Sequence, residues 1–185
     1  MTREELRVAL REHAYLEGDF ILRSGRRSSY YLDKYRFATQ PDVLAGVGAA
    51  LASAVAELEP DAARLAAPEL GAVALAAAAS LATGIPFVIV RKEEKGHGTG
   101  NRIEGPFAPG ERVCLIEDVV TSGGAALAAV EALRAARLAC GSAVCVVDRQ
   151  EGGAEQLARH GVRLRPLFRA SDLHEDRKSA ANPHG

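Results

Sequence analysis

Short apolar runs of strand length alternate with alanine-rich segments of helical length along most of this chain. The runs read ARLAAP, PFVIV, RVCLIE, SAVCVVD and VRLRPLF, and the helices that we predict between them cover residues 71–82, 124–139 and 153–160. Strands that are apolar almost throughout are typical of sheets covered on both faces, and alternation of strand with helix favours parallel pairing. The pattern predicts an α/β fold in which helices flank a parallel, twisted sheet.

The N-terminal part of the chain follows a different pattern. Leu6 and Leu10 fall on one face of a helix predicted over residues 3–13. The following segment, FILRSGRRSSYYLDKYRF, has two strand-like halves around a Ser-Gly-Arg turn. A long helix is then predicted over residues 42–58, directly after Pro41.

These elements are expected to form one domain, because the chain has 185 residues and no linker-like stretch divides it. We predict a single domain over residues 1–173, made of an N-terminal segment at about 1–40 and an α/β core at 41–173. The polar, unpatterned residues 174–185 are predicted to be a flexible tail.

Composition excludes several classes of function. The chain is 48% hydrophobic and 25% charged with a net charge of -1, so it has no overall attraction to nucleic acid or to a membrane. We find no apolar run long enough to span a bilayer, and the N-terminus reads as an amphipathic helix, not a signal peptide, so we expect a cytoplasmic protein. Cys114, Cys140 and Cys145 lack metal-ligand spacing and are expected to be reduced core residues.

Polar residues follow each predicted parallel strand at the point where it ends. In open parallel sheets, ligands bind beyond the carboxyl ends of the strands. The residues concerned are Glu69 and Gly71, Arg91 and Lys92, Glu117 and Asp118, and Asp148 and Arg149. Four such ends on one rim predict a polar site.

The segment VCLIEDVVTSGGAAL carries the strongest signal, because a strand ends in two carboxylates before a glycine turn opens a helix. Backbone N–H groups at such a turn, with the hydroxyls of Thr121 and Ser122, form a cradle for an anion. In the simpler alternative these hydroxyls only cap the helix, and Glu117 and Asp118 are surface charges. The acidic pair favours a site for phosphate and ribose, since carboxylates accept hydrogen bonds from ribose hydroxyls or contribute to the shell of a magnesium ion.

The stretch RKEEKGHGTGNRIEG combines many charges with many glycines. A charged stretch after a strand is often only a solvated loop. About fifteen residues without regular structure in a compact domain are, however, usually functional or a disordered linker. We therefore favour a functional loop at residues 91–105.

The segment CLIEDVVTSGGA resembles the signature of the type I phosphoribosyltransferases. Glu117 stands where an aspartate is commoner, and Ala125 where a small hydroxyl residue is frequent. The resemblance implies the fold of that family and a site for phosphoribosyl pyrophosphate. The residues that it assigns to this site are Glu117, Asp118, Thr121, Ser122, Gly123, Gly124 and Ala125.

Three further segments resemble orotate phosphoribosyltransferases in particular. RKEEKGHGTGNRIEG is similar to their mobile catalytic loop, which implies that Arg91, Lys92, Lys95 and His97 contact the pyrophosphate. FILRSGRRSSYYLDKY resembles the hood that covers the base, with Arg23 and Tyr31 at base-contacting positions, and DRQE implies that Arg149 pairs with the orotate carboxylate. By the same resemblance Thr121 also contacts orotate, and the catalytic residues are Lys95, His97 and Asp118.

The resemblance also implies the reaction and its partners. Orotate would displace pyrophosphate from phosphoribosyl pyrophosphate to give orotidine 5′-monophosphate, with Mg²⁺ held mainly by the substrate diphosphate and with no dedicated metal ligands in the protein. A homodimer with a shared active site is expected, without nucleic acid or membrane partners. Two alternatives stay open: a purine phosphoribosyltransferase of the adenine type, and a non-catalytic regulator that senses phosphoribosyl pyrophosphate.

Overall fold

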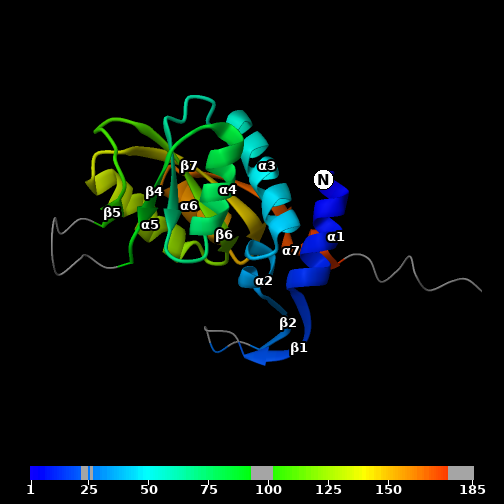
Figure 1. The fold of residues 1–185 in the computed structure, drawn as a ribbon. Helices are drawn as coiled ribbons and strands as arrows, with labels where there is room; N and C mark the ends of the chain where they lie inside the picture. Colours follow the sequence, from blue (N-terminus) through cyan, green and yellow to red (C-terminus); the bar gives the residue numbers. More distant parts are fainter. Residues whose placement is uncertain (22–24, 26, 93–101, 175–185) are drawn as a thin grey trace, which may run out of the picture.

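The computed structural model describes residues 1–21, 25, 27–92 and 102–174. Its centre is a six-stranded sheet with the strand order β5-β4-β3-β6-β7-β8 (Figure 1). The strands are β3 (Arg64–Pro68), β4 (Phe87–Val90), β5 (Ile103–Glu104), β6 (Arg112–Val120), β7 (Ala139–Asp148) and β8 (Arg163–Arg169). All neighbouring pairs are parallel except β4 with β5, so the predicted parallel sheet is confirmed, with a short antiparallel strand at its edge.

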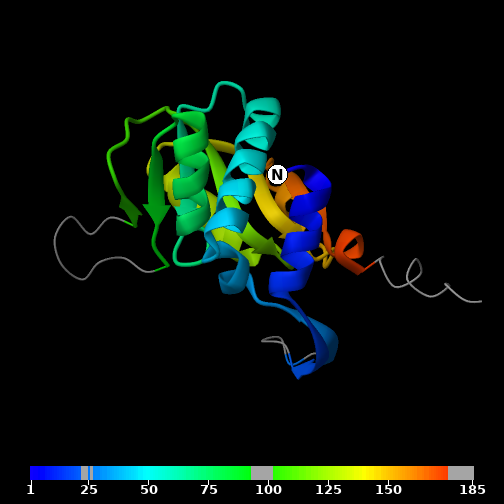
Figure 2. The ribbon, with the colours of Figure 1, turned by 45° about the vertical axis from the view of Figure 1, so that its right-hand side comes forward.

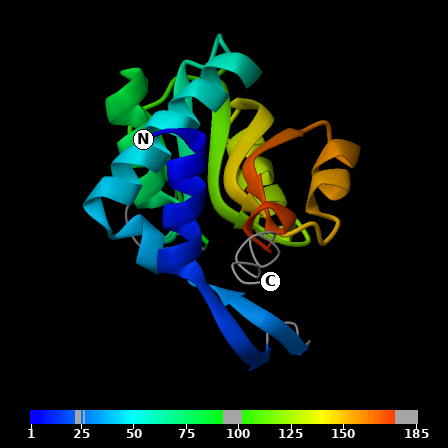
Figure 3. The same ribbon diagram turned by 90° about the vertical axis from the view of Figure 1, so that its right-hand side faces the viewer.

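Helices cover both faces of this sheet (Figure 3). They are α1 (Arg3–Ala14), α2 (Lys34–Ala38), α3 (Pro41–Leu58), α4 (Val73–Thr83), α5 (Gly124–Ala135), α6 (Gly153–Arg159) and α7 (Ala170–His174). One buried cluster joins the sheet to α1, α3 and α4, and a second lies against α5 and α6. Ile116 belongs to the first cluster and Leu115 to the second, because successive side chains of a strand point to opposite faces. This explains why the central strands are apolar throughout.

The elements differ from the sequence-based expectation mainly at their ends. The helix predicted over residues 124–139 ends at Ala135, because the chain turns at Arg137, whose φ is 63°, and β7 then begins at Ala139. The sequence pattern does not predict α2, α7 or β5. These elements have five residues, five residues and two residues, which is too short for a periodicity to show.

A two-stranded antiparallel hairpin, β1 (Tyr15–Ile21) with β2 (Arg27–Leu32), projects from the body of the protein (Figures 1 and 3). Aromatic contacts fasten its base. The ring of Tyr15 stacks on that of Tyr30 with 5.1 Å between centroids, and the Tyr15 hydroxyl lies 2.8 Å from Nδ1 of His174 in α7. The hairpin is therefore tied to the last described helix of the chain.

Two boundaries expected from the sequence need correction. Leu6 and Leu10 of α1 belong to the main buried cluster, so within residues 1–40 only the hairpin projects, and its Leu32 joins the same cluster. His174 is helical and packed against the hairpin, so it does not belong to the expected tail. Residues 175–185 lie outside the described part of the chain.

Helix α3 also departs from expectation, because by length and composition alone it is apolar enough to cross a membrane. The expectation that no apolar run reaches that length is wrong for Pro41–Leu58, whose mean hydropathy is 1.4. In the structure α3 lies on the sheet beside α4 (Figure 2), and Val47 and Leu51 are completely buried. Packing in the α/β body accounts for the apolar face of this helix.

The cysteines are core residues, as predicted. Cys114, Cys140 and Cys145 are buried and free of disulfides. Burial raises the pKa of the Cys114 thiol to about 12 and that of Cys140 to about 11. The reactive thiolate form is therefore scarce at neutral pH, which agrees with a packing role.

Helices α3 and α4 approach each other closely at Gly48. A Cβ at this position would lie 2.8 Å from the Cβ of Ala78 and 2.9 Å from its carbonyl carbon. Backbone atoms cannot move aside as a flexible side chain can. The glycine therefore sets the distance between the two helices.

We expect Gly48→Ala to lower the free energy of unfolding by about 1–3 kcal/mol, because the added methyl overpacks this contact. Alanine is more favourable than glycine in a helix by about 1 kcal/mol. A loss of stability would therefore occur although the substitution favours the helix itself. Gly46→Ala in the same helix is the control, since its nearest neighbour is the flexible end of the Met1 side chain. Urea denaturation measures the free energy of unfolding of both variants. Equal stabilisation of the two would contradict the overpacking expected at Gly48.

Candidate active site

The turn between β6 and α5 carries the predicted anion cradle. Gly123 is the N-cap residue with a φ of 83°, and α5 begins at Gly124. The N–H groups of a first helical turn have no partner within the helix. Among the described residues no side chain caps α5, and Thr121 and Ser122 are both exposed. The simpler alternative, in which these two hydroxyls cap the helix, is therefore wrong.

A glycine contact joins this turn to the end of the neighbouring strand. A Cβ at Gly153, the first residue of α6, would lie 2.5 Å from the carbonyl oxygen of Thr121. Gly123 in turn packs on the backbone of Gly153. The N–H of Arg149 donates to the carbonyl of Val120 over 2.9 Å. The structure thus brings Arg149 next to the turn at the shared rim of the sheet.

Asp118, the second residue of the acidic pair, is buried and paired. Its Oδ2 lies 2.8 Å from Nζ of Lys34, the first residue of α2, and its side chain is only 6% exposed. Its Oδ1 accepts the N–H of Val119 over 2.6 Å. A Cβ on Gly71 would overlap this carboxylate, so the segment after β3 also touches it. Three separate segments meet at Asp118.

Glu117, the first residue of the pair, is in a different state. It shares a strand face with Leu115, which belongs to the cluster beneath α5, and Oε1 of Glu117 has no hydrogen-bond partner in the described part of the chain. Burial, with a smaller effect from the charge of Asp118, raises the pKa of Glu117 to about 8. At neutral pH Glu117 is therefore mostly protonated, whereas the neighbouring Asp118 is paired with Lys34.

The side chain of Arg149 lies against the hairpin. Its guanidinium carbon is 4.9 Å from the centroid of the Tyr30 ring. Its Nε is 3.1 Å from Oε1 of Glu151, at ion-pair distance but without hydrogen-bond geometry. Tyr31, the predicted base-contacting residue, lies 5.6 Å from the Phe20 ring and is 43% exposed. The tyrosine that contacts the Arg149 guanidinium is therefore Tyr30, whereas Tyr31 contacts Phe20.

Arg91 and Lys92 follow β4 at the edge of the sheet. The N–H of Arg91 donates to the carbonyl of Arg102 over 2.8 Å, and its Nη1 lies 3.6 Å from Glu104. The N–H of Lys92 donates to Oε1 of Glu69 over 2.8 Å, and the Lys92 side chain is exposed. Glu69 thus fixes the backbone at the end of β4.

Four predicted site residues remain, of which one lies in the first turn of α5 and three lie outside the described residues. Ala125 is exposed in that first turn. Arg23, Lys95 and His97 lie outside the described residues. Sequence reasoning did not select Lys34 or Tyr30. The paired tyrosines at the end of a strand are a signal for Tyr30, whereas the partner of Lys34 is too distant in sequence to be predicted.

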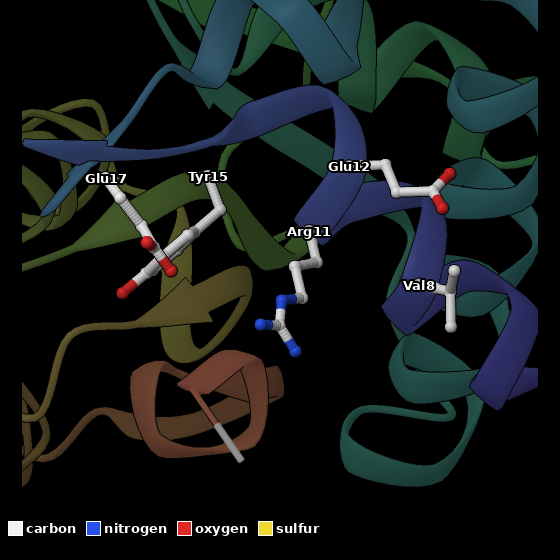
Figure 4. Close-up of a pocket in the computed structure, with 5 residues that line it drawn as sticks. All are labelled: Val8, Arg11, Glu12, Tyr15 and Glu17. Carbon is white, nitrogen blue, oxygen red and sulfur yellow. The ribbon is translucent and has the colours of Figure 1, made fainter. Parts of the chain in front are cut away.

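A hollow on another part of the surface contains none of the predicted site residues. It is lined by Val8, Arg11, Glu12, Tyr15 and Glu17, all of which come from α1 and the start of β1 (Figure 4). The chemistry-bearing residues lie instead at the carboxyl ends of β3, β6 and β7, where the fold of the sheet places a ligand.

The fold and this rim define a class of protein. Residues 33–160 match the family model described as the phosphoribosyl transferase domain. This range contains the whole of the sheet from β3 to β7, the cradle and Arg149. The chain belongs to the phosphoribosyltransferase family.

Relatives of known name identify the group within this family. The orotate phosphoribosyltransferase of Methanocella arvoryzae is 50% identical over 157 residues, 84% of this chain and 87% of that protein. The enzyme of the same name from Natronomonas pharaonis is 47% identical over 178 residues, 96% of this chain and 100% of that protein. This chain is therefore a member of the orotate phosphoribosyltransferases.

Solved structures give the same grouping. A crystal structure of the Mycobacterium tuberculosis orotate phosphoribosyltransferase with Fe(III) dicitrate has a TM-score of 0.83 at 33% identity, covering 93% of this chain and 98% of that chain. The same enzyme in complex with 5-phospho-alpha-D-ribosyl 1-diphosphate has a TM-score of 0.79 at 31% identity, covering 92% and 98%. This membership decides against the adenine-type alternative and against a non-catalytic regulator.

The raised pKa of Glu117 has a measurable effect on stability. A carboxyl that keeps its proton to about pH 8 when folded, but loses it near 4.5 when unfolded, stabilises the fold below pH 4.5. This contribution is lost as the pH rises to about 8. We expect the free energy of unfolding of the wild type to fall between pH 5 and 8, relative to Glu117→Gln, by up to about 1.4 kcal/mol per pH unit. Denaturant titrations across this range measure it, and parallel pH profiles would contradict the neutral state of Glu117.

Proposed function

We propose that this protein transfers the 5-phosphoribosyl group of phosphoribosyl pyrophosphate to orotate, giving orotidine 5′-monophosphate and pyrophosphate in pyrimidine biosynthesis. Family membership supports the reaction. The observation that carries it is the contact between the cradle and Arg149 through the Val120 carbonyl. It puts the anion-binding turn next to the backbone of Arg149, on the rim where α/β sheets bind ligands.

We assign the phosphate of the substrate to the turn at residues 121–124. The N–H groups at the start of α5 and the hydroxyls of Thr121 and Ser122 are available donors, and the N-terminus of a helix favours negative charge. Gly123 and Gly124 leave the backbone accessible, and Ala125 continues the same turn. The contact with Lys34 fixes the Asp118 carboxylate, which is therefore suited to accept hydrogen bonds from ribose hydroxyls, with Glu117 beside it.

Catalysis requires cations where negative charge develops on the departing diphosphate, and exclusion of water from the ribose cation that forms. We propose that Lys95 and His97 provide these cations, together with Arg91 and Lys92 at the end of β4. This assignment rests on the resemblance of residues 91–105 to the catalytic loop of the family. The anchoring of the Lys92 backbone by Glu69 supports it, because it fixes the point from which that loop starts.

We assign the base to the space between the hairpin and Arg149. A guanidinium presents a planar set of donors that matches the planar carboxylate of orotate. Arg149 is mostly buried, and its charge is offset by the Tyr30 ring and Glu151, so it is held in place before the substrate arrives. Arg23, Tyr31 and Thr121 are the further base contacts that we propose from the resemblance.

Magnesium fits this site as a companion of the diphosphate. Mg²⁺ prefers oxygen ligands and is commonly held by substrate phosphates with one or two carboxylates at most. Asp118 is committed to Lys34, and Glu117 is mostly neutral, so we propose that the diphosphate supplies most ligands. When bound, the ion neutralises charge on the leaving group. We also propose, from the family resemblance, a cytoplasmic homodimer in which the loop of one subunit reaches the active site of the other.

The reaction is tested by mixing the protein with phosphoribosyl pyrophosphate, Mg²⁺ and either orotate or adenine. We expect loss of orotate absorbance with orotate, and no product with adenine, because Arg149 selects for a carboxylate that adenine lacks. Chromatography of the products confirms orotidine 5′-monophosphate. Turnover of adenine alone would overturn the proposal.

Arg149 is expected to select orotate. Arg149→Lys keeps the charge but loses the planar fork, so KM for orotate should rise about tenfold to a hundredfold, as for loss of charge-assisted hydrogen bonds worth about 1.5–3 kcal/mol. KM for phosphoribosyl pyrophosphate should change less than about threefold. Arg165→Lys on β8 is the control, because Arg165 is partly exposed and pairs with Glu57. A rise in both Michaelis constants to the same extent would exclude a base-specific role.

A further inference from the structure

Lys34 occupies an unusual position for a lysine, because its ammonium reaches a buried carboxylate of the candidate site. The Nζ atom lies 2.8 Å from Oδ2 of Asp118, whose side chain is 6% exposed, whereas the lysine side chain is 37% exposed. Lys34 is the first residue of α2 and follows the hairpin strand β2 after a single residue, Asp33. It therefore joins the hairpin side of the molecule to the end of β6.

The surrounding backbone is shaped around this ion pair. The position that a Cβ would take on Gly71 overlaps the Asp118 carboxylate and lies 3.0 Å from Nζ of Lys34. Only a glycine leaves room there for both groups. The segment after β3, which lies at the same rim as the cradle, thus closes over the pair.

Both oxygens of Asp118 have a fixed donor. Oδ2 is paired with Lys34 and Oδ1 accepts the N–H of Val119. A carboxylate oxygen has more than one acceptor site, so each can still accept a further hydrogen bond. The Asp118 side chain is therefore held in one orientation while it keeps the capacity to bind a hydroxyl.

The charges also favour this arrangement. Burial alone would lower the pKa of Lys34, but the hydrogen bond and the charge of Asp118 outweigh it and raise that pKa overall. A carboxylate buried this deeply requires a partner for its charge. Lys34 is the cation that the structure places against Asp118.

We propose that Lys34 is a positioning residue of the phosphoribosyl site, whose ion pair holds Asp118 oriented to accept hydrogen bonds from the ribose hydroxyls of the substrate. The inference rests on the proposed function for the identity of that substrate. It assigns a role at the active site to a residue at the junction of the hairpin and the core. Lys34 acts through Asp118, so its effect must vanish when Asp118 is replaced by a side chain that cannot form this ion pair.

A double-mutant cycle tests this dependence. Lys34→Met, Asp118→Asn and the double variant are compared with the wild type by kcat/KM for phosphoribosyl pyrophosphate at saturating orotate. We expect Lys34→Met to lower kcat/KM about tenfold to a hundredfold in the wild type, but less than about threefold in the Asp118→Asn background. Lys34→Arg should restore most of the loss, because it returns a cation. Equal losses in both backgrounds would overturn the proposal, since they would mean that Lys34 contacts the substrate directly or acts on the fold.

Controls separate this role from a structural one. Arg36→Met removes an exposed cation from the same helix and should change kcat/KM by less than about twofold. Thermal melting by circular dichroism checks each variant, and Lys34→Gln replaces Lys34→Met in the cycle if the latter unfolds. Calorimetric titration of phosphoribosyl pyrophosphate gives the same cycle without turnover. If the wild type binds phosphoribosyl pyrophosphate but does not consume orotate, the proposed reaction is overturned. The double-mutant cycle can then still be measured by calorimetry.

Discussion

The site depends on a close approach of two backbone turns at the rim of the sheet. Gly123 and Gly153 pack with no side chain between them, and the N–H of Arg149 donates to the carbonyl of Val120. Any Cβ at Gly153 would push the β7–α6 turn away from the β6–α5 turn. The distance between the proposed anion cradle and the backbone of Arg149 is therefore set by backbone packing.

Features encoded in short stretches of sequence were predictable. The central strands are largely apolar because their buried side chains lie in one of two clusters on opposite faces, and this pattern is visible in the sequence. The cradle is also local, since the strand end, the acidic pair and the glycine turn are consecutive. Arg149 could be placed at the same rim because parallel strands end on the same side of a sheet.

Contacts between distant segments were not predictable in the same way. The partner of Asp118 is Lys34, which belongs to a short helix that leaves no periodicity in the sequence. The raised pKa of Glu117 depends on burial, which is decided by tertiary packing. The choice between Tyr30 and Tyr31 depends on which face of β2 turns toward the core. The end of α5 was misplaced because alanine-rich sequence continues past the turn at Arg137.

The contact between Tyr15 and His174 links the two ends of the described chain. An isolated two-stranded hairpin is marginally stable in water, so the order of β1 and β2 depends on the aromatic contacts at their base, including those with α7. Loss of α7, the last described helix, would therefore remove part of the support of the hairpin. Because Leu173 of α7 also belongs to the main buried cluster, proteolytic trimming into this helix would loosen the hairpin and the adjoining core together.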